Sequence, residues 1–504
     1  MGARTGKEFL AGLKARSRDI WIDGESVKDV TTHPKTSGAA NTMARVFDRQ
    51  HERADICLVD DVETGEKINV SHHIPRSHDE VRARHAGLTE ISEVSMGIMG
   101  RTPDYMNMKF SAFAAAPWVW AGEDNRNEEG SNNLVGFQKK AAREDLSMTH
   151  TIVNPTNDKS GSDNQFADMG NKVAVRKVGE TSEGIIVRGA RVLATLAPFA
   201  DVQTVYPGPP LPPGTDPSYA VSFWVPLNTP GMKFFCRDSL SAPESDSWNK
   251  PLSARFDEQD AFCVFDDVLV PWENVFIDSD VEIYNAMQQT DFWINMTTQA
   301  TTRALTKLEF AYGLANRMAE MTGDNSHGTI DLLGEIACYV QATRNALELS
   351  VEHAYQRERC GSWFPAGAPL HPMRALLPGW MVRVADIVTM IGGHNLLTTP
   401  SKNQFDDPAL RPLIEETLWG ANDTAADERA EVFRMAWDFV GSGLAGRGFL
   451  YERFYLMSAP RNRALQHRVF TDRTRANRCV DEMLELARLS PNAPASTPLI
   501  HRVS

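Results

Sequence analysis

The spacing of apolar residues changes twice along the chain. From residue 34 to about 52, and again from about 77 to 99, apolar positions recur at the three- and four-residue spacing of a helix. Before them, residues 19–30 place two short apolar runs on either side of Asp23-Gly24, which is typical of a β-hairpin. Residues 1–145 are therefore predicted to form a mostly helical N-terminal domain with one small hairpin.

From residue 146 onward, short β-rich runs alternate with turns that contain glycine. These runs cover 172–178, 184–187, 191–195, 219–225, 232–236 and 262–270. The pattern predicts an antiparallel β domain over residues 146–278. The acid-rich segment 255–275 leads into its last strand, and its composition favours a sheet edge that ends at Pro271.

Helical spacing returns after Asp278. It is clearest over 305–318 and 333–351, and further helices are expected over 373–395, 410–440 and 461–488. Long helices with short connections predict an antiparallel bundle over residues 279–504. Helices, then a sheet, then helices make an α+β protein and exclude a doubly wound sheet, which needs alternating β and α units.

Composition narrows the function classes. The 504 residues carry a formal charge of −14 with no basic block, so no nucleic-acid partner is expected. The most apolar stretch, residues 110–121, is too short for a membrane span and contains Pro117. No apolar segment follows the first residues, so we expect a cytoplasmic protein. None of the six cysteines lies within twenty residues of another, so no metal site is predicted.

One nucleotide-binding motif is present in the wrong context. Residues 441–446 fit G-x-G-x-x-G, but a predicted helix precedes them, whereas a dinucleotide site needs a preceding strand. We therefore expect no NAD(P)H site. The glycines instead predict a loop at the end of a helix, or a loop that meets a ligand beside Arg447.

Three residues are candidates for chemistry. Pro103 is expected to stop a helix, which would leave Arg101 and Tyr105 on a loop. His150 lies where the β domain begins. Taken singly, an arginine and a tyrosine in a turn more often form a salt bridge and a packing contact, and a lone histidine is usually structural.

Collinear segments across most of the chain are similar to motifs of one family. They are TGKEFLAGL (5–13), VKDVTTHP (27–34), GRTPDY (100–105), THTIVNP (149–155), GIIVRGARVLAT (184–195), RFDEQDAFCVFDDVLVPWENV (255–275) and GRGFLYE (446–452). They resemble the family of 4-hydroxyphenylacetate 3-monooxygenase oxygenase components. Members of this family are the oxygenases of two-component, FADH₂-dependent phenol hydroxylases. The resemblance implies an acyl-CoA dehydrogenase-like fold: N-terminal helices, a β-barrel-like middle domain and a C-terminal four-helix bundle.

The resemblance also implies partners and site residues. FADH₂ would come from a separate NAD(P)H-dependent flavin reductase, and the chain would form a homotetramer or homodimer. Arg101, Tyr105 and His150 match the family's phenol-binding residues. Expected flavin contacts, which lie between the β domain and the bundle, are His150, Thr151, Ile152, Thr156, Asn157, Asp158, Lys159, Thr195 and the bundle loop Leu444, Ala445, Gly446 and Arg447.

The implied reaction is ortho hydroxylation of a phenol to a catechol. Reduced flavin and O₂ would form a C4a-hydroperoxide, whose distal oxygen reacts far better with a phenolate than with a phenol. His150 would be the base, Arg101 would hold the phenolate and Tyr105 would orient it. Residues 198–215 are expected to close over the site and keep it dry.

Several alternatives remain open. Within the family, the competing activity is hydroxylation at a ring carbon that carries a halogen or a nitro group. An acyl-CoA dehydrogenase-like enzyme would need a glutamate base in the bundle and a cleft for coenzyme A, and a non-catalytic binding subunit would need neither. A 4-hydroxybutyryl-CoA-type dehydratase, by contrast, is excluded, because it would need several cysteines for an iron–sulfur cluster and no close cysteine pair exists in this sequence.

Overall fold

The computed structural model describes residues 2–16, 19–155, 173–489 and 492. Helices dominate its N-terminal region: α1 (Gly6–Ala15), α2 (Ser37–Glu52), α3 (Ala54–Cys57), α4 (His78–Glu93), α5 (Pro103–Ala114), α6 (Pro117–Ala121) and α7 (Glu128–Arg143). The helices predicted over 34–52 and 77–99 are confirmed as α2 and α4. The hairpin is confirmed as β1 (Ile20–Ile22) and β2 (Glu25–Ser26), and Asp23 and Gly24 take the positive φ that its turn needs. A second small hairpin pairs β3 (Leu58–Asp60) with β4 (Lys67–Asn69).

Two sheets form the middle region. The larger has the order β2-β1-β10-β11-β7-β6, with β6 (Arg176–Glu180), β7 (Gly184–Thr195), β10 (Met232–Cys236) and β11 (Asp260–Pro271). The smaller has the order β12-β9-β8-β5, with β5 (Met148–Thr151), β8 (Val202–Val205), β9 (Ser222–Pro226) and β12 (Val275–Ile277). The pairing is antiparallel as predicted, except that β1 joins β10 and β5 joins β8 in parallel.

Three expectations about these strands were wrong. β11 lies between β10 and β7, so the segment that contains it is interior and is not a sheet edge. The two runs expected over 184–195 form one strand, β7, because a shift of register against β11 lets the chain continue without a turn. Part of the expected closing loop 198–215 is β8, a strand held by neighbours on both sides.

The inner faces of the sheets share one core with the N-terminal helices. Phe223, Phe234 and Phe265 are buried between the strands, together with Phe9 of α1 and Phe47 of α2. The N-terminal helices and the sheets are thus fixed against each other by apolar burial.

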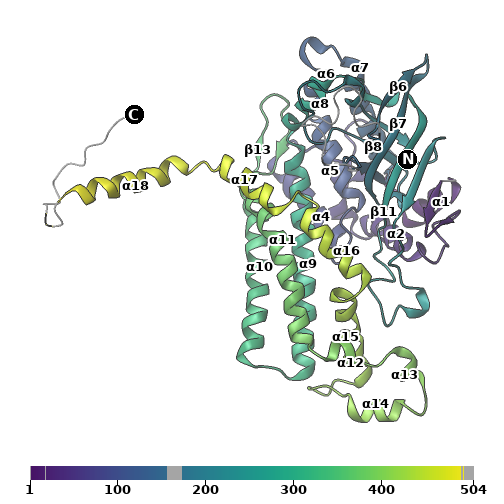
Figure 1. Ribbon diagram of the computed structural model, residues 1–504, viewed down its shortest axis with the longest axis vertical. Helices are drawn as coiled ribbons and strands as arrows, with labels where there is room; N and C mark the ends of the chain where they lie inside the picture. The colour runs from purple at the N-terminus through teal and green to yellow at the C-terminus, as the bar shows by residue number, and fades with distance from the viewer. Residues whose placement is uncertain (1, 17–18, 156–172, 490–491, 493–504) are drawn as a thin grey trace.

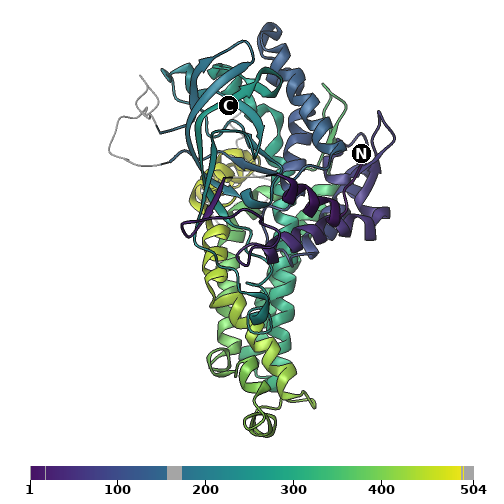
Figure 2. The same cartoon turned by 90° about the vertical axis from the view of Figure 1, so that its right-hand side faces the viewer.

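A four-helix bundle forms the C-terminal region. Its helices are α9 (Phe292–Thr322), α10 (His327–Glu352), α11 (Leu370–Gly392) and α15 (Ala426–Val440), and α16 (Gly443–Phe454) packs against α11 and α15. Figure 2 shows the bundle as a narrow column below the broader part that holds the sheets. By length and composition α11 is apolar enough to cross a membrane, but it packs inside this bundle with half of that apolar window buried.

The last two predicted helices are each divided. The region 410–440 holds α14 (Arg411–Thr417) and α15, because Asn422 and Asp423 between them adopt positive φ, which ends a helix. The region 461–488 holds α17 (Ala459–Val469) and α18 (Arg473–Arg488). Helix α18 projects away from the rest of the molecule and contains no buried residue (Figure 1).

Candidate active site

Helix α5 brings two of the candidate side chains to one face. Pro103 occupies the first turn of α5, where its missing N–H costs nothing, so it opens a helix where the sequence analysis expected it to close one. Tyr105 therefore lies in the first turn and not on a loop, and only Arg101 precedes the helix. Lys109 follows Tyr105 by four residues and so shares its face. All residues of α5 are buried, and Arg101 is only 9% exposed.

The imidazole of His150 lies between two tyrosine rings. Its ring centroid is 5.4 Å from that of Tyr105 and 5.7 Å from that of Tyr206, and both pairs are stacked. His150 belongs to β5, and Tyr206 directly follows β8, the parallel neighbour of β5. Burial lowers the pKa of His150 well below its usual range, and the positive charges of Lys109 and Arg101 lower it further. The imidazole is therefore neutral at physiological pH.

Arg101 is fixed at two points: Glu258 binds its backbone, and aromatic side chains contact its guanidinium. The backbone N–H of Arg101 donates to the Glu258 carboxylate at 3.0 Å, and that of Gly100 donates at 3.0 and 3.1 Å. The guanidinium carbon lies 3.9 Å from the centroid of the Tyr105 ring, and Nη1 donates to the hydroxyl of Tyr451 on α16. The Arg101 side chain thus faces aromatic rings on two elements.

The residues expected on a bundle loop are helical. Ser442 caps α16 by accepting from the Ala445 N–H at 3.1 Å, so Leu444, Ala445, Gly446 and Arg447 form the first turns of that helix. Only Gly441 and the cap residue Ser442 connect α15 to α16.

Arg447 is bound to two carboxylates, the buried Glu258 and the partly buried Asp260. Its guanidinium donates to Glu258 at 2.6 Å and to Asp260 at 2.8 and 2.9 Å. Burial alone would raise the pKa of Asp260, but Arg447 and Arg237 hold it far below its usual range. Because Glu258 also binds the backbone at Arg101, this carboxylate connects α16 to the loop before α5.

The remaining expected flavin contacts lie at the ends of strands. Thr195 is the last residue of β7, and its hydroxyl donates to Asp260 at 2.7 Å while its carbonyl accepts from Thr149 at 2.7 Å. Thr151 ends β5 and is buried, and Ile152 follows it, partly exposed. Thr156, Asn157, Asp158 and Lys159 lie outside the described residues.

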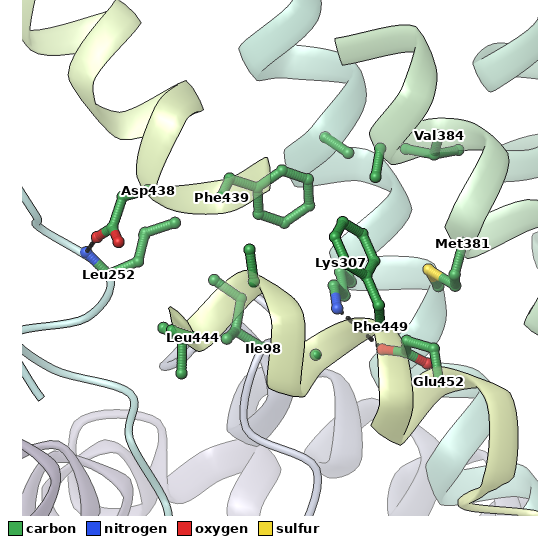
Figure 3. A pocket seen from close by; sticks show the side chains of 14 residues that line it. Ile98, Leu252, Lys307, Met381, Val384, Asp438, Phe439, Leu444, Phe449 and Glu452 are labelled. Atoms are coloured by element: carbon green, nitrogen blue, oxygen red, sulfur yellow. Dashed lines mark hydrogen bonds and ion pairs between the residues drawn. The ribbon is translucent and has the colours of Figure 1, made fainter. Parts of the chain in front are cut away.

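A cavity of about 30 Å³ lies beside the first turn of α16 (Figure 3). Leu444 and Ala445 line it together with Phe439 of α15 and Lys307 of α9, whose amine binds Glu452 at 2.9 Å. None of Arg101, Tyr105 and His150 lines this cavity.

The structure thus gathers Arg101, Tyr105 and His150 at one place and sets Thr195 and Arg447 beside them through Asp260 and Glu258. Sequence reasoning missed the partners of these residues: Lys109, Tyr206, Tyr451, Glu258 and Asp260. A signal existed for Lys109 in its four-residue spacing from Tyr105, and Tyr451, Glu258 and Asp260 fell inside segments noted for their family motifs.

Comparison with known proteins gives a consistent result along the chain. Two family models match, 4-hydroxyphenylacetate 3-hydroxylase N terminal over residues 5–277 and C terminal over residues 283–485. The 4-hydroxyphenylacetate 3-monooxygenase oxygenase component of Thermus thermophilus is 36% identical over 90% of this chain and 92% of its own. The 4-nitrophenol 2-monooxygenase oxygenase component of a Rhodococcus species is 30% identical over 90% and 85%.

Solved structures agree with the fold. The crystal structure of a 4-hydroxyphenylacetate 3-monooxygenase oxygenase component, complexed with FAD and 4-hydroxyphenylacetate, has a TM-score of 0.87 with 33% identity, covering 96% of this chain and 99% of the other. A 4-hydroxybutyryl-CoA dehydratase from N. maritimus has a TM-score of 0.84 at 17% identity, covering 98% and 97%, and shares the fold alone. The predicted α+β architecture is confirmed.

Proposed function

The chain belongs to the 4-hydroxyphenylacetate 3-hydroxylase family, and from that premise we propose that it hydroxylates a phenol ortho to its hydroxyl group. It is a flavin-dependent monooxygenase of the two-component type, whose FADH₂ comes from a separate reductase. The observation that supports the proposal best is the stacked group of Tyr105, His150 and Tyr206 with Arg101 against one of its rings.

An unsatisfied arginine fits the flavin. Arg191 of β7 is 2% exposed, and among the described residues neither its Nε nor its Nη1 has a hydrogen-bond acceptor. Leaving buried donors unpaired is costly, so a ligand with phosphate or carbonyl oxygens suits this position. Thr151, Ile152 and Thr195, and Leu444 to Arg447 on α16, would line the flavin between the sheets and the bundle.

The side chains have complementary roles in the reaction. When bound, reduced flavin would supply the two electrons with which one oxygen atom of O₂ enters the ring and the other leaves as water. Arg101 holds the phenol oxygen as it becomes negative, since its guanidinium stays charged and is only partly used by Tyr451. Tyr105 orients the same oxygen.

His150 takes the phenol proton. Its lowered pKa keeps a ring nitrogen free to accept, and the phenolate left beside Arg101 and Lys109 offsets the positive charges that lower that pKa. Proton transfer from the phenol to His150 therefore leaves the net charge of the site unchanged.

Reconstitution tests this function. The chain with a flavin reductase, NADH, FAD and a panel of phenols should yield products heavier by one oxygen atom, and the chain alone should not oxidise NADH. NADH oxidation without the reductase, or coupled NADH use with no oxygenated product from any phenol, would contradict the proposal. Nitro- and halophenols belong in the panel because the Rhodococcus relative is a nitrophenol monooxygenase.

An acyl-CoA dehydrogenase-like reaction is less well supported. A buried glutamate that the bundle offers near the site, Glu452, is held by Arg303 at 2.8 and 2.9 Å and by Lys307 at 2.9 Å. These cations lower its pKa to about 2 against the effect of burial. Such a carboxylate is a poor base.

We also propose a cytoplasmic homo-oligomer, a dimer or a tetramer. Helix α18 leaves the body of the protomer, and Val480, Met483 and Leu484 on it are 58%, 63% and 52% exposed. A second copy of the chain would cover these residues. Light scattering after gel filtration should show an oligomer for the full chain and a smaller species for Met483→Glu with Leu484→Glu. A monomeric full chain would contradict this.

A further inference from the structure

The small cavity beside the first turn of α16 is used by no step of the proposed reaction. Figure 3 shows Leu444 and Ile98 on one side of it and Met381 and Val384 of α11 on the other. Apart from Gly448 and three charged residues, the residues that line it are apolar. Its volume is about 30 Å³. A molecule the size of water needs roughly 10–15 Å³ of such space, so the cavity has room for one or two small molecules.

The charged groups in the wall of this cavity already have partners in the protein. The Lys307 amine binds Glu452 at 2.9 Å, and Glu452 also accepts from Arg303 at 2.8 and 2.9 Å. Asp438 accepts from two consecutive backbone N–H groups, both at 2.8 Å. A buried water needs two to four polar partners, whereas apolar cavities stay dry and take up apolar molecules. The wall therefore favours a small apolar guest over water.

The wall on the side of the active site is made by the two segments that carry the site. Ile98 precedes Arg101 by three residues, and Leu444 precedes Arg447 by three. The Glu258 carboxylate binds the Arg101 N–H at 3.0 Å and the Arg447 guanidinium at 2.6 Å, so it holds both segments together. The cavity thus lies directly behind the turn of α16 that is expected to meet the flavin, on its bundle side.

The proposed reaction needs a small apolar substrate at a place that must be kept dry. Molecular oxygen carries no charge and no hydrogen-bond donor, so it can enter apolar space without leaving a polar group unsatisfied. Water is held back by the cost of losing its own hydrogen bonds. An apolar cavity on the bundle side would admit oxygen without opening the side of the site where Arg101, Tyr105 and His150 lie.

We propose that this cavity binds molecular oxygen and supplies it to the flavin from the bundle side. The inference rests on the proposed function and adds the place where its second substrate is held. Oxygen leaves the cavity between Ile98 and Leu444. Two small residues keep the space open, Ala311 of α9 and Ala385 of α11, since a larger side chain at either position would fill it.

Xenon tests the cavity without any flavin, because xenon is an apolar atom that enters dry cavities. Crystals of the wild-type chain under xenon pressure should hold xenon between Ala311, Phe439 and Leu444. Crystals of Ala311→Val should hold none there. A wild-type cavity that holds ordered water and takes up no xenon would overturn the proposal.

The rate of reaction with oxygen tests the function of the cavity. When the chain with bound FADH₂ is mixed with O₂, the second-order rate constant for flavin oxidation should be roughly tenfold lower in Ala311→Val, because oxygen must then cross close-packed side chains. Ala385→Val should act in the same way from the other helix. The phenol concentration that gives half-saturation should not change. An unchanged rate constant in a variant that no longer binds xenon would overturn the proposal.

A matched control separates a filled cavity from a disturbed core. Ala315 lies one turn after Ala311 on α9 and is buried in the same cluster, but it does not line the cavity. Ala315→Val should therefore lose stability while it keeps both the xenon site and the rate of reaction with oxygen. Equal slowing in Ala311→Val and Ala315→Val would overturn the proposal.

This inference and the proposed function can fail separately. If no phenol is hydroxylated but flavin oxidation still depends on Ala311, the proposed function fails and the oxygen site stands. If phenols are hydroxylated and flavin oxidation is as fast in Ala311→Val as in the wild type, the oxygen site fails and the proposed function stands.

Discussion

Two groups of cations with little solvent exposure lie next to each other, and they differ in whether a carboxylate pairs with them. The paired cations, Arg303, Lys307 and Arg447, bind Glu452, Glu258 and Asp260. The aromatic-lined cations, Arg101 and Lys109, face tyrosine rings, and among the described residues neither side chain forms an ion pair with a carboxylate. Tyr451 is shared by the two groups, since the guanidinium groups of Arg101 and Arg447 both lie against its ring, at 5.1 and 4.8 Å.

The difference distinguishes structural from chemical roles. A buried cation with its own carboxylate is satisfied inside the protein, and removing it leaves an unpaired charge. A buried cation among aromatic rings still has donors to offer to a bound anion. The paired cations should therefore control stability, and the aromatic-lined cations should control catalysis.

The strongest test replaces one arginine from each group. Arg101→Ala should lower coupled hydroxylation by roughly 10² or more, because one charged donor at the phenolate oxygen is lost. Arg447→Ala should destabilise the protein by about 3 kcal/mol, because Glu258 loses its ion-pair partner and Asp260 keeps only Arg237. Product yield per NADH and urea denaturation measure the two effects. The comparison fails if Arg101→Ala keeps its product yield.

The sequence was most informative where structure is local. β10 and the helices α9, α10 and α11 follow from the spacing of apolar residues, and β10 has the bounds that were predicted. The pattern failed where one residue sets the boundary. Pro103 suits the first turn of a helix as well as its end, and Asn422 and Asp423 interrupt a helical pattern by their backbone conformation alone.

The residues of the site also fall into those that the sequence predicted and those that only the fold reveals. Arg101, Tyr105 and His150 were identified through family motifs, and the structure places them together. Their supports could not be found from spacing, because Glu258 is 157 residues from Arg101 and Tyr451 is 350 residues away. Only the folded chain shows that one carboxylate holds both Arg101 and Arg447.

A second test asks whether His150 acts as a base. His150→Ala should lose roughly 10²-fold in rate with a weakly acidic phenol, whose pKa is about 10. The loss should be much smaller with a nitrophenol, which arrives as phenolate and has no proton to remove. Single-turnover hydroxylation after mixing reduced enzyme with O₂ measures both rates. Equal losses would make His150 a positioning residue, and the role of base would then fall to water or Tyr105.

A third test concerns Glu258, whose carboxylate contacts a residue of each group, the backbone of Arg101 and the guanidinium of Arg447. Glu258→Gln keeps one oxygen for the Arg101 backbone and removes the charge that Arg447 binds, so we expect a loss of about tenfold in kcat beside a loss of stability. Asp438 is the matched control: it is equally buried and accepts from the consecutive N–H groups of Leu252 and Ser253, both at 2.8 Å.

Asp438→Asn should lose stability with kcat unchanged, because Asp438 holds a loop that does not carry Arg101. If both variants lose kcat in proportion to their stability, Glu258 has no special relation to Arg101. If Glu258→Gln alone loses kcat, the carboxylate positions the loop before α5.

The smallest expected effect is in the pH dependence of stability. The pKa of Glu452 falls from an ordinary 4.5 to about 2 in the folded protein, since Arg303 and Lys307 outweigh its burial. A carboxyl whose folded pKa is lowered contributes stability above its unfolded pKa, and that contribution is lost as pH falls from about 4.5 to about 2. Glu452→Gln cannot titrate, so its stability should fall less steeply in this window than that of the wild type. Urea midpoints at several pH values between 2 and 7 measure the difference. Parallel profiles would show that Glu452 is not held by its cations, and the contrast between the two groups would lose its electrostatic basis.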